Sequence, residues 1–299
     1  MSGKPITSQS RARRFRAELQ RDTLAVPGVF NAFSARLVED AGFPAAYLSG
    51  AGLAASRALP DIGLLTMTEV VTETRYVTQR VQIPVIIDAD TGFGDRHQVY
   101  RTVQELESAG AVGIQLEDQV LAKRCGHLPG KTLISCEGMC QKIQSAVEAK
   151  QDRDLVIIAR TDARSVEGLD GAIERARAYR AAGADAIFPE ALQSAKEFEA
   201  VASALEDSGS FLVANMTEWG QTPYITVKEF SGMGYHVVLF PMTVFRMMAK
   251  VGEEALLELK KHGTQESILS RMQTRQALYE VLGYEQYDLF DRRMREGTE

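Results

Sequence analysis

The chain has 299 residues, of which 45% are hydrophobic and 25% charged, a composition typical of a globular protein. Polar side chains interrupt every apolar stretch before it reaches about 18 residues, so we expect no membrane-spanning helix and no membrane partner. The net charge of −6 offers no basic surface for a phosphate backbone. This balance argues against nucleic-acid binding and favours small-molecule chemistry.

The N-terminal region predicts a helix over residues 10–21. Ser10 is a candidate N-cap, and Phe15 with Leu19 forms an apolar pair one turn apart. The arginines and serines of this region also resemble a mitochondrial transit peptide, which is the alternative hypothesis. Three cysteines, at positions 125, 136 and 140, are too few for a disulfide framework and indicate a reducing compartment. We therefore expect a cytoplasmic protein.

Eight short apolar runs follow, each rich in branched residues and each succeeded by a turn and a helix-like stretch. Their starts recur at roughly 30 residues, the length of a strand–helix–strand unit. Their nearly continuous apolar character is typical of parallel strands covered on both faces. We predict an α/β fold, a (β/α)8 barrel forming a single domain over residues 1–299. The predicted strands are 24–30, 45–48, 84–89, 112–116, 155–159, 186–188, 211–214 and 236–240.

The segments left over by the eight units have predicted places. The N-terminal helix covers the bottom of the barrel, and residues 118–135 form a glycine-containing lid on the active face. Two helices, 244–262 and 265–282, follow the last strand within a C-terminal association element over about 244–299. Because the second carries more apolar surface than a lone outer helix needs, we expect subunit contacts, with helices swapped in a homotetramer built as a dimer of dimers.

The predicted strand ends are strongly polar, and in such a barrel they form the active face. Asp88 and Asp90 follow the third strand, and Glu117 and Asp118 follow the fourth. Crowded carboxylates raise one another's pKa unless a cation neutralises them. Oxygen ligands suit a hard divalent ion, so we predict a Mg²⁺ site, with Mn²⁺ as a possible substitute. The alternative is zinc, held by Cys125, His127, Cys136 and Cys140.

Basic residues at other strand ends favour an anionic ligand. Arg160 ends an apolar strand and therefore needs an acidic partner. Arg246 and Arg275 offer the same planar fork for carboxylates. Together with the acids and a metal, these residues predict a pocket for a small di- or tricarboxylate.

The segment Lys123-Arg-Cys-Gly-His127 carries the sharpest local signal. A cysteine beside three basic residues can have a lowered pKa and exchange protons near neutrality. Cys125 is therefore a candidate proton donor, although a lone cysteine is commonly a small buried hydrophobe.

At these residues the sequence resembles the isocitrate lyase and phosphoenolpyruvate mutase superfamily over essentially the whole chain. The resemblance is carried by Tyr47-Leu-Ser-Gly50, Asp88-Ala-Asp-Thr-Gly-Phe-Gly94, Ile114-Gln-Leu-Glu-Asp-Gln119, Lys123–His127, Ala159-Arg-Thr-Asp162, Phe188-Pro-Glu-Ala191 and Asn215-Met-Thr-Glu218. The Lys123–His127 loop is specific for the lyase branch. The chain departs from the closest pattern at Ala51, Leu128 and Gly130, which affects a substrate-contacting position and the lid.

The resemblance implies a role for each matching residue. Asp88 and Asp90 would hold Mg²⁺, with Glu117 in its second shell or bound through water, and we add Asp61 as a further ligand. The catalytic residues would be Cys125 as the acid, Arg160 as a charge stabiliser and Tyr47 as a base whose pKa is lowered near the metal. The substrate-binding residues would be Ser49, Gly50, Ala51, Gly126, His127, Arg160, Glu190, Asn215, Met216, Thr217, Arg246 and Arg275.

The implied reaction is the Mg²⁺-dependent cleavage of 2-methylisocitrate into pyruvate and succinate, a step of propionate catabolism through the methylcitrate cycle. Alternatives within the superfamily are 2,3-dimethylmalate cleavage, oxaloacetate decarboxylation and carboxyphosphonoenolpyruvate mutase chemistry. A catalytically silent binding protein is the alternative from another class.

Overall fold

The computed structural model describes residues 8–121, 123–124, 126 and 130–296. They divide into two compact units, Met1–Val244 and Phe245–Glu299. No helix of the described chain is long and apolar enough to cross a bilayer.

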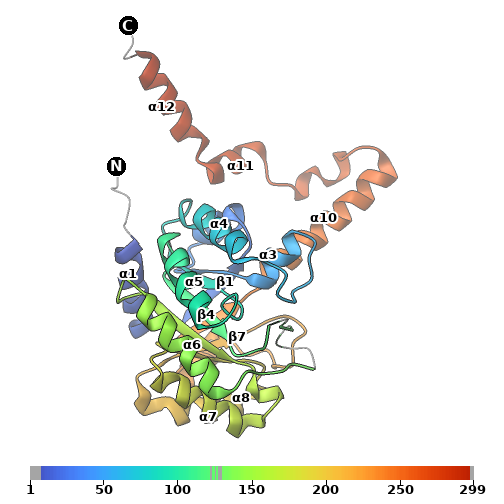
Figure 1. The fold of residues 1–299 in the computed structure, drawn as a ribbon. Helices are drawn as coiled ribbons and strands as arrows, with labels where there is room; N and C mark the ends of the chain where they lie inside the picture. Colours follow the sequence, from blue (N-terminus) through green and yellow to red (C-terminus); the bar gives the residue numbers. More distant parts are fainter. Residues whose placement is uncertain (1–7, 122, 125, 127–129, 297–299) are drawn as a thin grey trace. The chain divides into compact units, whose positions relative to one another are not determined.

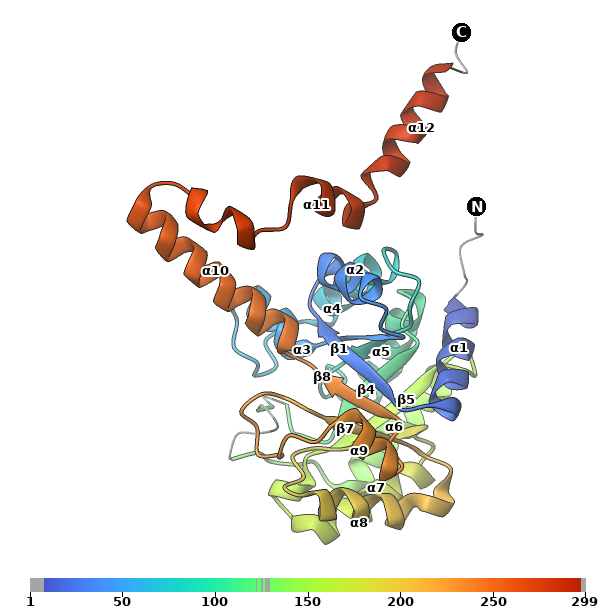
Figure 2. The same ribbon diagram turned by 180° about the vertical axis from the view of Figure 1, so that it is seen from behind.

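Eight parallel strands of the first unit close into a barrel in chain order, which confirms the predicted (β/α)8 fold (Figure 1). Each strand starts and ends within two residues of its predicted bounds. The barrel closes where β1 pairs in parallel with β8, with Leu24 opposite Val237; the two strands lie side by side in Figure 2. The strands are β1 Leu24–Val29, β2 Ala46–Leu48, β3 Val85–Asp88, β4 Gly113–Glu117, β5 Val156–Thr161, β6 Ala186–Pro189, β7 Phe211–Asn215 and β8 Val237–Phe240.

Helices follow the strands and cover the outside of the barrel (Figure 1). Several begin at a side-chain cap; Asn31, for example, accepts the backbone N–H of Ser34 at 2.8 Å. The helices of this unit are α1 Ser8–Arg21, α2 Ala32–Asp40, α3 Gly50–Ser56, α4 Met67–Thr78, α5 Arg96–Ser108, α6 Cys136–Ala149, α7 Gly168–Ala181, α8 Ala195–Leu205 and α9 Val227–Gly232, with short 3-10 turns at Ala163–Ser165 and Glu206–Ser208.

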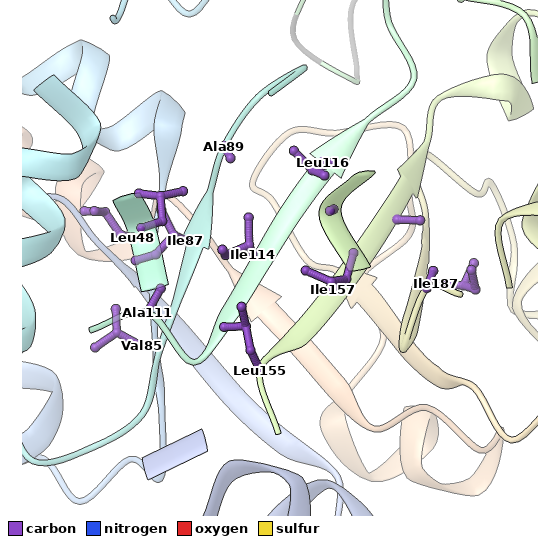
Figure 3. Close-up of a cluster of buried hydrophobic side chains, with 14 of the residues drawn as sticks. Leu48, Val85, Ile87, Ala89, Ala111, Ile114, Leu116, Leu155, Ile157 and Ile187 are labelled. Carbon is purple, nitrogen blue, oxygen red and sulfur yellow. The ribbon is translucent and has the colours of Figure 1, made fainter. Parts of the chain in front are cut away.

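Neighbouring strand residues alternate between two apolar cores. Ile87 and Ile157 belong to the core between the strands and the helices, part of which is drawn in Figure 3. Ile86 and Ile158 belong to the core inside the barrel. Both faces of each strand are therefore buried, which explains the nearly continuous apolar runs in the sequence.

Helix α1 contributes to the inner core, as predicted for a helix that covers the barrel bottom. Ala12, Phe15 and Leu19 pack with Leu24 and Val156 at the first residues of their strands. Arg16 fixes the helix further. Its guanidinium lies 2.6 Å from Asp185 Oδ1 and donates to the carbonyls of Asp154 and Leu155.

The second unit contains most of α10 Thr243–His262, then a 3-10 segment Glu266–Arg271, α11 Arg275–Leu282 and α12 Tyr284–Glu296. The single helix predicted over 265–282 was wrong. Thr274 is extended and accepts the N–H of Ala277, so a new helix starts there, and Gly283 ends it in the left-handed region at φ +68°.

Candidate active site

Three buried carboxylates meet at the carboxyl ends of β3 and β4. Asp88 ends β3, Asp90 lies two residues beyond, and Glu117 ends β4; ligand oxygens from the three all lie within 4.8 Å of one another. Asp90 adopts a left-handed backbone at φ +47°, and its carbonyl accepts the N–H of Glu117 at 2.9 Å. This strained turn brings the two strand ends together, as strained backbone commonly does at functional sites.

The cluster fits a divalent cation. Both carboxylate oxygens of Glu117 are buried without a hydrogen-bond donor. Burial, reinforced by the charge of Asp88, raises the pKa of Asp90 to about 6, although Lys123 opposes the rise. Burial also raises the pKa of Glu117 well above its usual range. Buried carboxylates of this kind gain from a hard cation with oxygen ligands.

Zinc has less support among the described residues. The metal-competent cluster there consists of carboxylates alone, without histidine or cysteine. Cys136 and Cys140 pack on α6 against the outer core, and burial raises the pKa of the Cys140 thiol to about 11. A neutral thiol is a poor zinc ligand.

Lys123 reaches the acidic cluster from the loop after β4, a contact that the sequence did not reveal. Its side chain is 5% exposed, and Nζ lies 2.7 Å from Asp90 Oδ1 and 2.5 Å from Asp61 Oδ1. The surrounding carboxylates raise the pKa of Lys123 against the effect of burial, so it stays charged. Asp61 therefore approaches the cluster through a lysine, whereas we predicted that it binds metal.

Arg160 lies among acids from three neighbouring elements. Its Nε is 3.1 Å from Asp162 Oδ2 and 3.5 Å from Glu117 Oε2, and its Nη1 is 3.4 Å from Glu190 Oε2. The guanidinium carbon also lies 5.3 Å from the centre of the Phe188 ring. The acids raise the pKa of Arg160 despite its burial. The sequence predicted that Arg160 needs an acidic partner, and the structure provides three. One of them, Glu117, also belongs to the metal-competent carboxylate cluster.

Glu190 and Asn215 form the next part of the site, at β6 and β7. Asn215 Nδ2 donates to both oxygens of Glu190, at 3.0 and 3.3 Å. Ala191, in the left-handed region at φ +58°, donates its N–H to Glu190 Oε1 at 2.8 Å. These contacts fix the carboxylate beside Arg160.

Ser49, Gly50 and Ala51 lie at the start of α3. Ser49 caps the helix by accepting the N–H of Gly52 at 3.2 Å. The N–H of Gly50 donates to Asp88 Oδ2 at 3.1 Å. A Cβ at position 50 would lie 2.9 Å from that oxygen, so only glycine allows the helix start to approach the cluster this closely.

The protein's own side chains shift the pKa of Tyr47 in the direction opposite to the lowering that we predict beside a bound metal. The residue is fully buried inside the barrel, and this burial raises its pKa well above the usual value, with the charge of Asp88 adding to the rise. Its hydroxyl donates to Gln115 Oε1 at 2.6 Å. A neutral phenol acts as a hydrogen-bond donor and is a poor base.

Asp118 has a different role from the one that its sequence position suggested. Rather than joining Glu117 in a metal cluster, it accepts the Thr161 hydroxyl at 2.7 Å, the Asp162 N–H at 2.9 Å and the Tyr179 hydroxyl at 2.7 Å. Arg175 links this group to the loop by donating to the carbonyl of Ile134. Successive side chains of a strand point to opposite faces of the sheet, so Asp118 points away from the face on which Glu117 lies. This alternation was the sequence signal that could have separated the two acids.

The remaining predicted site residues belong to several parts of the chain. Cys125, His127 and Leu128 are outside the described residues. Arg246 and Arg275 belong to the second unit, in α10 and at the first residue of α11. Met216 packs into the outer core, so its side chain serves the fold, and Thr217 is half-buried. Gly126 is buried against Arg160 and Glu190, as expected of a residue at the site.

The closed parallel barrel with buried carboxylates at its strand ends defines a metal-competent α/β-barrel site of the kind that acts on small anions. A family model described as phosphoenolpyruvate phosphomutase matches residues 15–260. The chain belongs to this family, the phosphoenolpyruvate mutase/isocitrate lyase superfamily, and so confirms the resemblance seen in the sequence.

Comparison with individual relatives shows which members of the superfamily the chain is similar to. The chain is 52% identical to a 2-methylisocitrate lyase of Aeropyrum pernix over 91% of its own length and 87% of that protein. It is 45% identical to the 2-methylisocitrate lyase of Escherichia coli, covering 95% and 96% of the two chains. Among solved structures, a 2,3-dimethylmalate lyase superposes with a TM-score of 0.87 at 34% identity, covering 97% of this chain and 96% of that one.

Proposed function

We propose that the protein is a carbon–carbon lyase that cleaves 2-methylisocitrate into pyruvate and succinate. Similarity to 2-methylisocitrate lyases over nearly the full length of both chains carries this conclusion. The buried carboxylate cluster and the arginine beside it supply the chemistry that such a reaction needs.

Asp88 and Asp90 would hold the cation, and Glu117 would contact it directly or through water; Mg²⁺ is our proposed ion and Mn²⁺ a substitute. When bound, it would withdraw charge from the oxygens of the keto acid. Arg160 is our proposed second stabiliser of that charge, because Asp162 and Glu190 already fix its orientation. Ser49, Gly50 and Ala51, with Glu190, Asn215 and Thr217, would bind the substrate around it, and Arg246 and Arg275 would bind its further carboxylates.

The cleavage requires two proton movements. A base removes the proton of the substrate hydroxyl, whose oxygen becomes the carbonyl of pyruvate as the carbon–carbon bond breaks. The bonding electrons remain on the succinate carbon, and the Cys125 thiol protonates it. Tyr47 is our proposed base, with its pKa lowered by the bound metal against the rise that burial causes. Closure of the loop over residues 118–135 would exclude water from the carbanion.

The test measures pyruvate formation from 2-methylisocitrate with Mg²⁺, with 2,3-dimethylmalate, isocitrate and oxaloacetate assayed in parallel. We expect 2-methylisocitrate to be the best substrate, and EDTA to abolish turnover until Mg²⁺ or Mn²⁺ is restored. The structural similarity to 2,3-dimethylmalate lyase makes that acid the second candidate. Turnover of 2,3-dimethylmalate without any turnover of 2-methylisocitrate would reject our assignment.

Two cysteine variants test the proton donor. Cys125→Ser should lower kcat by about 1,000-fold, because a hydroxyl is a much weaker acid than a thiol. Cys136→Ser, a change of the same kind on α6, should remain within twofold of wild type. Full activity of the first variant would contradict the role of Cys125.

We further propose a cytoplasmic homotetramer with C-terminal helices exchanged between subunits, in which the enzyme serves propionate catabolism.

A further inference from the structure

The backbone on the N-terminal side of Cys125 is held by the side-chain amide of Gln119. Gln119 is buried, with 1% of its surface exposed. Its Nε2 donates to the carbonyl of Arg124 at 2.8 Å, and its Oε1 accepts the N–H of Arg124 at 2.9 Å. One amide thus satisfies both polar groups of a single loop residue.

The backbone on the other side of Cys125 is held by Lys131. The Lys131 side chain is 1% exposed, and its Nζ donates to the carbonyl of Gly126 and to Asp162 Oδ1, the latter at 2.9 Å. Asp162 also accepts from Nε and Nη2 of Arg160, at 3.1 and 3.3 Å. Lys131 therefore ties the loop to the carboxylate that orients the proposed charge stabiliser.

Gly126 lies directly on the site at the point where Lys131 holds it. A Cβ at this position would lie 2.4 Å from Arg160 Nη2 and 2.5 Å from Glu190 Cγ. The base of the loop is closed by antiparallel pairing, in which Val120 donates to the carbonyl of Thr132 and Ile134 to that of Asp118, each at 2.9 Å. Lys131 thus extends from a fixed base to a backbone position against the reacting groups.

We propose that Lys131 and Gln119 are positioning residues that set the place of Cys125 through the backbone of Gly126 and Arg124. The inference rests on the proposed function, in which Cys125 is the proton donor. Charge-assisted hydrogen bonds made by a buried ammonium are stronger than neutral ones. A displacement of about 1 Å at a reacting group can lower a rate about 100-fold. In this way, buried side chains anchored at the barrel fix the position of Cys125, the proposed acid in the loop.

The test compares Lys131→Met with Lys150→Met. Lys150 makes the same kind of contacts at the opposite end of the barrel, where Nζ donates to the carbonyl of Leu155 at 3.0 Å and to Asp185 Oδ2 at 3.1 Å. Lys131→Met should lower kcat at least 30-fold with KM within threefold of wild type, and Lys131→Arg should recover part of the loss. Lys150→Met should keep kcat within twofold. A Lys131→Met enzyme with kcat within twofold of wild type would overturn the proposal.

A second measurement needs no substrate. The rate of Cys125 alkylation by iodoacetamide, followed by mass spectrometry of its peptide, should change at least fivefold in Lys131→Met and stay unchanged in Lys150→Met. An unchanged rate in Lys131→Met would overturn the proposal, even if kcat fell, because the effect would then come from the charge on Asp162. If no substrate is turned over, the proposed function fails while alkylation still decides the positioning role.

Gln119→Glu provides a variant of nearly the same shape if Lys131→Met does not fold. A carboxylate cannot donate to the carbonyl of Arg124, so a similar fall in kcat and a changed alkylation rate are expected. Wild-type values for both would overturn the proposal.

Discussion

At the scale of single residues, the site depends on backbone approaches that leave no room for a side chain. Gly126 is the clearest case, since an added Cβ would meet both Arg160 and Glu190. We expect Gly126→Ala to lower turnover about 100-fold by displacing the loop or the guanidinium. The stability of the fold should be little changed, because the clash is confined to the site.

The matched control for this prediction is Gly232→Ala. Gly232 ends α9, and a Cβ there would meet no atom within 4 Å. Turnover by Gly232→Ala should equal that of wild type in the pyruvate assay. If Gly126→Ala also stayed within threefold of wild type, the close approach at Gly126 would have no catalytic consequence.

His236 gives a prediction for the pH dependence of stability. Its Nδ1 accepts the N–H of Leu212 at 3.0 Å, and burial lowers its pKa. The folded protein therefore prefers the neutral imidazole. This contribution to stability is complete above the unfolded pKa of about 6.5 and is lost as the pH falls below that value.

We expect the urea midpoint of wild type to fall more between pH 7.5 and pH 5.5 than that of His236→Asn, whose amide oxygen can accept the same N–H. Each protein serves as its own control at pH 7.5. Parallel pH profiles for the two proteins would show that His236 does not titrate on unfolding.

At the scale of elements, helix α1 completes the inner core of the barrel. Phe15 is 1% exposed and packs with residues at the starts of the strands. Phe15→Ala should lower the free energy of unfolding by about 3 kcal/mol, through lost burial and the cavity left behind. Arg13→Ala, on the exposed side of the same helix, should change it by less than about 0.5 kcal/mol. A loss below about 1 kcal/mol for Phe15→Ala in urea unfolding would mean that the barrel bottom does not need this helix.

Element periodicity also explains which parts of the fold the sequence could predict. Strands buried on both faces produce continuous apolar runs, and these runs marked all eight strands. The break at Thr274 was missed because the apolar residues on its two sides happen to keep a helical spacing. The hydrogen bond from Ala277 to Thr274 shows that capping overrides this spacing.

At the scale of the whole molecule, the second unit presents large apolar side chains to solvent. Leu256, Leu257, Tyr287 and Phe290 are each more than half exposed. Such a surface is typical of a subunit interface, which is the basis of our proposed tetramer.

We expect light scattering to give the mass of a tetramer for wild type and a smaller mass for Phe290→Glu, because a charge opposes burial of that surface. Gln286→Glu, which adds the same charge on the same helix at a more polar position, should keep the wild-type mass. A wild-type monomer would contradict the proposed assembly.

The sequence by itself determined the barrel, its strand order and the identity of the acids at its strand ends, because these depend on local periodicity and on residues adjacent to each strand. Only the tertiary structure decided how those acids divide. Asp88, Asp90 and Glu117 converge, whereas Asp118 contacts Thr161 and Tyr179. The contacts of Lys123 with the cluster and of Lys131 with Gly126 were likewise visible only in the tertiary structure. The direction of a side chain and the pKa of a buried group depend on neighbours distant in the chain, which no local pattern records.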